Sequence, residues 1–146
     1  MKTINDYENS GRTKFITNFL NIFYPNAVTS KASLTASNDL LSITKDEILI
    51  IEIKERDAKY TNSTMLLEQK KYNALLAIKD KIALITTKPI KILYAFVFDT
   101  NNSTKVAELN QDNNYEWIDQ KQQKTQCFNQ NKIDKKITYI NGNLYE

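Results

Sequence analysis

The sequence contains no histidine among its 146 residues, and this absence excludes several kinds of catalytic chemistry. Ser-His-Asp and Cys-His nucleophilic sites, HExxH zinc sites and histidine-dependent metal nucleases all need an imidazole group. Any hydrolysis carried out by this chain must therefore depend on carboxylates, lysine and hard metal ions such as Mg²⁺.

Cysteine is almost as scarce, because Cys127 is the single one in the sequence. It cannot form an internal disulfide, and without a histidine to activate it we interpret it as a structural residue. No apolar run approaches the roughly 20 residues of a membrane-spanning helix, and the N-terminal stretch MKTINDYENSGRTKF lacks the apolar segment of a secretory signal. We therefore expect a cytoplasmic protein that has no membrane partner.

The composition is that of an ordinary globular protein, with 41% hydrophobic and 25% charged residues. The length favours a single domain with its own core. The net charge of +3 is compatible with a polyanionic partner but is too small to demonstrate one.

Helical periodicity predicts a first helix from Asp6 to Phe23, ended by Tyr24-Pro25-Asn26. Its apolar face consists of Phe15, Ile16, Phe19, Leu20 and Phe23. A β-hairpin is predicted next, formed by segment 31–43 (KASLTASNDLLSI), the polar turn 44–47 (TKDE) and the β-branched run 48–54 (ILIIEIK).

A second helix is predicted from Thr64, a candidate N-cap, and the sequence leaves open whether it continues beyond Asp80. Pro89 breaks the chain, and the apolar run 92–99 (ILYAFVFD) predicts a buried strand. The order helix, strand, strand, helix, strand predicts an α/β fold with a small mixed β-sheet flanked by helices.

The remainder of the chain has weaker patterns, although no linker separates it, so we expect residues 1–146 to form one domain. Its core would span about 6–100, and 101–146 would be an extension whose role the sequence does not give. Segment 113–119 (NNYEWID) is an edge strand or a helix start, and 120–132 is a loop or an exposed helix. A final hairpin is predicted across Asn141-Gly142.

The turn of the first hairpin decides which side chains face each other. If Thr44 to Glu47 form the turn, Ile43 faces Ile48. The same register then places Asp39 opposite Glu52, with two carboxylates on one face of the hairpin. A slip of one residue would separate them, so the prediction depends on this register.

Two carboxylates that face each other destabilise a hairpin unless a cation lies between them. Their hard oxygen ligands favour Mg²⁺ or Mn²⁺ over Zn²⁺. Lys54, two residues after Glu52, points to the same face and would orient a water molecule or stabilise charge on a phosphate. Leu40 and Ile51 point to the opposite face, toward the core.

An acidic residue followed on the next strand by Glu-x-Lys resembles the signature of the PD-(D/E)XK nuclease superfamily. Asp39 matches the acid and Glu52-Ile53-Lys54 matches the ExK part, while Asn38 stands in the place of the proline. The resemblance covers about Tyr7 to Thr100. Within the superfamily, the order of elements and the interval between the acid and ExK are most similar to archaeal-type Holliday junction resolvases.

The resemblance implies a restriction-endonuclease-like core that hydrolyses DNA phosphodiester bonds with Mg²⁺, or with Mn²⁺ in its place. It assigns Asp39 and Glu52 to the metal, adds the backbone carbonyl of Ile53 as a ligand, and gives Lys54 the role of orienting the nucleophile. Glu8, in the first helix, is the candidate for a further catalytic and metal-binding carboxylate.

Contacts with DNA are expected from a basic rim and from the helix that follows ExK. The candidates are Arg56, Lys59, Gln69, Lys70 and Lys71. The resemblance implies branched DNA as the preferred substrate, and it implies a homodimer because one site cuts one strand.

Other interpretations remain open at this stage. Glu52 and Lys54 could be solvent-facing charges on an edge strand, paired with Lys45 or Asp57, and the basic rim could be a solvated surface. A restriction or homing endonuclease is an alternative with the same chemistry. A catalytically inactive nucleic-acid-binding protein with the same fold is an alternative from another class.

Overall fold

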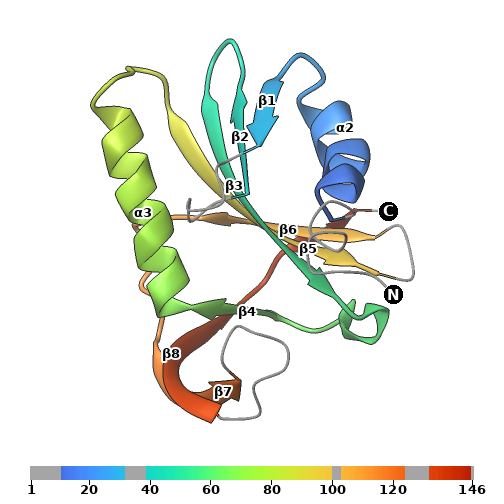
Figure 1. Ribbon diagram of the computed structural model, residues 1–146, viewed down its shortest axis with the longest axis vertical. Coiled ribbons are helices and arrows are strands. Elements are labelled where there is room, and N and C mark those ends of the chain that lie inside the picture. The colour runs from blue at the N-terminus through green and yellow to red at the C-terminus, as the bar shows by residue number, and fades with distance from the viewer. Residues whose placement is uncertain (1–10, 32–38, 100–102, 124–131, 146) are drawn as a thin grey trace.

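The computed structural model describes residues 11–31, 39–99, 103–123 and 132–145, and in them β-strands dominate a mixed α/β arrangement (Figure 1). The strands are β1 (Val28–Lys31), β2 (Leu40–Ile43), β3 (Ile48–Arg56), β4 (Met65–Glu68), β5 (Ile90–Phe98), β6 (Thr104–Leu109), β7 (Ile118–Gln123), β8 (Lys132–Ile140) and β9 (Asn143–Tyr145). Within the described residues the main sheet has the order β1-β2-β3-β5-β6-β9, and a second sheet has the order β4-β8-β7.

A helix occupies residues 11–23, and we call it the N-terminal helix. It continues through a π turn, η1 (Ile16–Leu20), into α2 (Asn21–Phe23). Its predicted end is confirmed, because Tyr24 has left the helical backbone conformation. Its predicted start at Asp6 lies outside the described residues. None of the helices in the described part of the chain is both long and apolar enough to cross a membrane.

The register of the predicted hairpin is confirmed by the pairing of β2 with β3, in which Ile43 faces Ile48 and Leu40 faces Ile51. Its first arm is shorter than the predicted 31–43, because Lys31 belongs to β1 and 32–38 lie outside the described residues. Thr44 stabilises the turn, because its hydroxyl accepts hydrogen bonds from the backbone N–H groups of Asp46 and Glu47. The sequence analysis missed β1, which pairs with the outer edge of β2.

The predicted start of the second helix is wrong. Thr64 caps nothing, because Met65–Glu68 forms strand β4 and the helix α3 is Gln69–Ala83. In β4, Met65 and Leu67 are both fully buried while the residues between and after them are half-exposed, which is the alternation of a strand. The helix ends within a turn of Asp80, and the predicted buried strand that follows is confirmed as β5.

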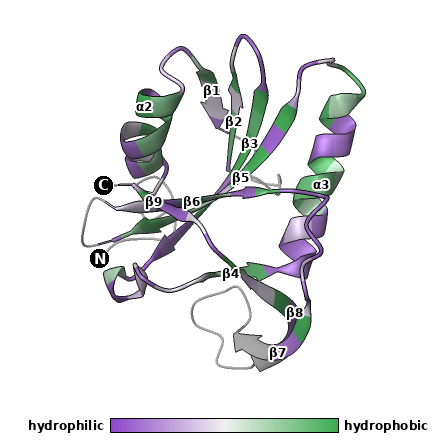
Figure 2. Ribbon diagram, turned by 180° about the vertical axis from the view of Figure 1, so that it is seen from behind, coloured by the Kyte–Doolittle hydropathy of each residue, from purple (hydrophilic) through white to green (hydrophobic). Residues whose placement is uncertain are grey.

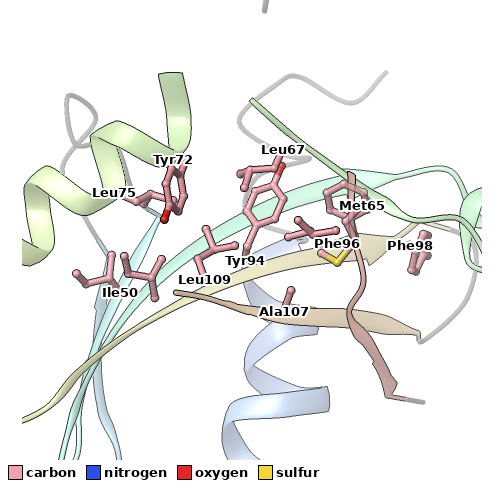
Figure 3. Close-up of a cluster of buried hydrophobic side chains, with 12 residues drawn as sticks. Ile50, Met65, Leu67, Tyr72, Leu75, Tyr94, Phe96, Phe98, Ala107 and Leu109 are labelled. Carbon is pink, nitrogen blue, oxygen red and sulfur yellow. The ribbon is translucent and has the colours of Figure 1, made fainter. Parts of the chain in front are cut away.

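Strand β3 lies at the centre of the main sheet, antiparallel to β2 and parallel to β5. Its side chains alternate between two hydrophobic clusters on the two faces. Leu49 and Ile51 pack with the N-terminal helix, whereas Ile50 packs with Tyr72 and Leu75 of α3 (Figure 3). Each face of the sheet is thus covered by one helix, and hydrophobic and hydrophilic residues alternate along α3 (Figure 2), as expected of a helix with one buried side.

The last part of the chain contributes to both sheets. Strand β6 pairs with β5 and β9 pairs with β6, while β8 pairs with both β4 and β7. The segment 113–119 therefore leads into an edge strand, one of the two alternatives. The prediction of loop or exposed helix is wrong for 120–123, which lies in β7, and 124–131 lies outside the described residues.

The predicted hairpin across Asn141-Gly142 is also wrong, because β8 and β9 belong to different sheets. Gly142 lies where the chain crosses between them. A Cβ atom there would lie 2.6 Å from the Met65 sulfur and 3.0 Å from the Val106 carbonyl oxygen. A local turn signal therefore marked a site of close backbone approach.

Candidate active site

Glu52 lies in the middle of the central strand β3, and only 5% of its surface is exposed. The edge-strand interpretation of this residue is therefore wrong. An ionised carboxylate at such a position is costly unless charges or hydrogen bonds compensate it. The surroundings of Glu52 decide what the residue can do.

Asp39 directly precedes β2, and it follows from the hairpin register that Asp39 lies beside Glu52. Its backbone N–H donates a hydrogen bond of 2.8 Å to the carbonyl of Ile51. Its carboxylate Oδ2 accepts a hydrogen bond of 2.7 Å from the backbone N–H of Ile53. The carboxylate of Asp39 is thus held against the backbone of β3 beside Glu52.

The surroundings of Glu52 raise the pKa of its carboxyl group. Burial, and after it the negative charge of Asp39 and a hydrogen bond with it, raise the pKa of Glu52 to about 7. Lys54 and Lys71 lower the same pKa without offsetting burial and Asp39. The two lysines therefore do not keep Glu52 fully ionised at neutral pH, because burial disfavours its charged form.

Three basic side chains contact the two carboxylates. Lys71 Nζ lies 3.0 Å from Glu52 Oε2, and Lys54 Nζ lies 3.8 Å from Glu52 Oε1. Arg12 Nη2 lies 3.5 Å from Asp39 Oδ1. Sequence reasoning placed Lys54 and Lys71 near Glu52 and missed Arg12, which no local pattern marks because the N-terminal helix meets β2 only in the folded protein.

The hydroxyl of Tyr94 helps to position the elements around Glu52. Tyr94 is the neighbour of Glu52 in the β3–β5 register, and its hydroxyl donates a hydrogen bond of 2.9 Å to the Leu66 carbonyl of β4. Burial raises the pKa of Tyr94, so the hydroxyl stays protonated and keeps this bond. Because β4 leads directly into α3, the contact fixes the first turn of α3, where Lys71 lies.

Two of the predicted DNA-contacting residues stack on aromatic rings. The guanidinium of Arg56 stacks 4.8 Å from the ring centroid of Phe96, and Lys59 Nζ lies 4.9 Å from that of Tyr60. The first turn of α3 carries Gln69, which is half-buried, and Lys70, which is exposed. Glu8 lies outside the described residues.

The oxygen donors of Asp39, Glu52 and the Ile53 carbonyl are of the type that Mg²⁺ prefers. Among the residues the structure describes, no group of three or more acidic or cysteine side chains could hold a metal ion. The described part of the chain thus offers a metal ion two carboxylates and one backbone carbonyl, which are ligands of a suitable chemical type.

Compared with known proteins, the sequence matches no protein-family model and no curated protein.

Proposed function

We propose that the protein is a Mg²⁺-dependent endonuclease that hydrolyses phosphodiester bonds of DNA, similar to the PD-(D/E)XK nucleases. The observation that carries the proposal is the buried Glu52, which shares one site with a second carboxylate and with Lys54 and Lys71. Perturbed carboxyl groups next to lysines are typical of functional sites, because such arrangements cost folding stability.

The order of the elements supports a restriction-endonuclease-like core. The N-terminal helix is followed by the antiparallel strands β1, β2 and β3, then by α3 and by β5 parallel to β3. This order agrees with the predicted one apart from the added strands β1 and β4. It places ExK on the central strand, with one helix over each face.

In this proposal Asp39, Glu52 and the Ile53 carbonyl would hold the metal ion. A bound Mg²⁺ would lower the pKa of a water molecule and neutralise charge developing on the phosphate. Lys54, on the same face of β3 as Glu52, orients the attacking water and contacts the phosphate. The hydrogen bond from Ile53 N–H keeps the Asp39 carboxylate in place during the reaction.

The substrate preference and the assembly state in this proposal derive from the resemblance to Holliday junction resolvases. We propose a four-way DNA junction as the preferred substrate and a homodimer as the active form, because cutting two strands requires two sites. Gln69, Lys70, Lys71, Arg56 and Lys59 are the proposed DNA contacts.

A second candidate function, nucleic-acid binding without catalysis, is favoured by one observation. Each carboxylate oxygen of Asp39 and Glu52 already contacts a basic side chain or a backbone N–H. Such a compensated cluster is what a nucleic-acid-binding protein without catalysis would retain. Metal-dependent cleavage separates the two functions.

The deciding experiment measures cleavage of a labelled four-way junction, a linear duplex and single-stranded DNA with Mg²⁺ or Mn²⁺. We expect the wild-type protein to cut the junction fastest. Glu52→Gln and Lys54→Ala should each reduce the rate by about 10²–10³-fold, the range seen when one electrostatic catalytic group is removed.

The matched control is Glu47→Gln, the same substitution at the start of the same strand, where Glu47 pairs with Lys91. We expect this variant to cut like the wild type. If the protein cuts none of the three substrates but binds them, the non-catalytic function replaces the nuclease. Faster cutting of the duplex than of the junction would favour a restriction or homing type of enzyme.

A further inference from the structure

The basic side chains around Glu52 and Asp39 oppose the binding of a metal ion. Among the described residues, two carboxylates are contacted by three cationic side chains, from Arg12, Lys54 and Lys71. A divalent cation that enters this site is repelled by all three, and it competes with them for the same oxygens. A metal ion and the full set of cations therefore cannot both occupy these contacts.

Lys71 is the cation whose release would free Glu52 most effectively. Its Nζ lies 3.0 Å from Glu52 Oε2, closer than the 3.8 Å between Lys54 Nζ and Oε1. Lys54 is only two residues from Glu52 on the same strand, so its backbone stays next to the carboxylate. Lys71 comes from a different element, and a lysine side chain can swing its compact ammonium group over several ångströms.

The position of Lys71 also suits an incoming phosphate. Lys71 lies in the first turn of α3, where the backbone N–H groups and the helix dipole favour an anion. Its side chain is 26% exposed, so solvent reaches part of it. The same turn carries Gln69 and the exposed Lys70, and it contains no acidic residue.

We propose that Lys71 is exchanged between Glu52 and a phosphodiester of DNA. In the metal-free protein it neutralises Glu52, and when DNA binds it moves to a phosphate oxygen and opens Glu52 to the metal ion. This inference rests on the proposed nuclease function. Its consequence is that DNA and metal bind cooperatively, because each favours the same position of Lys71.

The exchange predicts opposite effects of one substitution on two ligands. Mn²⁺ binding to the full chain is measured by isothermal titration calorimetry at pH 8.5, above the pKa of about 7 of Glu52. We expect Lys71→Met to bind Mn²⁺ at least about fivefold more tightly than the wild type. Lys71→Arg, which keeps the cation, should stay within about twofold of it.

The second measurement is the affinity for a short fluorescent duplex in EDTA, followed by anisotropy. We expect Lys71→Met to weaken this binding by about fivefold, because a phosphate contact is lost. Lys79→Met is the matched control in both measurements, since it removes a lysine from the same helix about two turns farther along. It should change neither affinity.

The outcomes separate the two proposals. If Lys71→Met leaves Mn²⁺ affinity unchanged or weaker, or leaves DNA binding unchanged, the exchange is overturned while the metal site stands. If neither the wild type nor any variant binds Mn²⁺, the metal site and the exchange fall together. Should Lys71→Met not fold, Lys71→Gln replaces it, because a glutamine can still donate a hydrogen bond to Glu52.

Discussion

Glu47 and Glu52 lie on either side of the same apolar run, and their surroundings differ in burial and in charge. Glu47 is half-buried, with Lys91 Nζ 3.2 Å from its Oε2, and the hydrogen bond to Glu47 raises the pKa of Lys91. We call these two residues the Glu47 pair. The Glu52 cluster, consisting of Asp39, Glu52, Lys54 and Lys71, is more buried and contains a second acid.

The difference shows what each group of charges contributes. Glu47 has one lysine partner, and solvent also reaches it. Glu52 has two lysine partners, yet burial and the neighbouring Asp39 raise its pKa to about 7. A fold selected for stability alone has no need of the second arrangement. The Glu52 cluster is therefore where we expect binding and chemistry.

The largest expected difference between the Glu52 cluster and the Glu47 pair is in how each makes the free energy of unfolding depend on pH. The pKa of Glu52 is about 7 in the folded protein against the ordinary value of 4.5, so between these values the folded state retains a proton that the unfolded state releases. Stability must then fall as pH rises from about 4.5 to 7, by about 3 kcal/mol. Urea unfolding at a series of pH values measures this slope.

Glu52→Gln should remove that slope and be the more stable protein at pH 8.5, whereas Glu47→Gln should retain the wild-type slope. Because other groups titrate in the same range, the quantity to compare is the difference between each variant and the wild type. A slope that Glu47→Gln removes and Glu52→Gln keeps would reverse the comparison.

The next effect is stabilisation by metal. A ligand present at 100 times its dissociation constant raises the free energy of unfolding by about 2.7 kcal/mol when it binds only the folded state. We expect Mn²⁺ to stabilise the wild type and Glu47→Gln by this amount at pH 8.5. Glu52→Gln should gain nothing. Equal stabilisation of all three proteins would place the metal elsewhere, and thermal or urea unfolding measures it.

The smallest effect concerns the Glu47 pair. Its side chains are 19% and 37% exposed, and ion pairs accessible to solvent contribute about 0.2–1 kcal/mol. A double-mutant cycle of Glu47→Gln and Lys91→Met should therefore give a coupling energy below about 1 kcal/mol that decreases with added salt. A larger coupling would mean that the two glutamates are more alike than their burial indicates.

The sequence predicted those parts of the fold that depend on neighbouring residues. The turn at Thr44 and the alternation of β-branched residues define the hairpin register, and this register brings Asp39 to Glu52. The apolar run that became β5 is long enough to predict a buried strand without knowing its partners.

The features that sequence reasoning missed depend on contacts between distant segments. Strand β4 is only four residues long, and it is stabilised by pairing with β8, where Met65 faces Ile140. The local turn signal at Asn141-Gly142 was overridden because Asn143 pairs with Val106 instead of folding back on β8. Arg12 reaches Asp39 only because the N-terminal helix packs over the sheet.

The pairing of β4 with β8 has a consequence for the order of folding. Contacts between segments this far apart in sequence form late, because a long loop must close before the strands can pair. The first turn of α3 follows β4 directly, and Glu68 at its start pairs with Lys135 of β8. During synthesis, β3 and β5 can therefore pair before Lys71 is held in place. We expect Glu52 to gain its complete surroundings only after β8 has emerged from the ribosome.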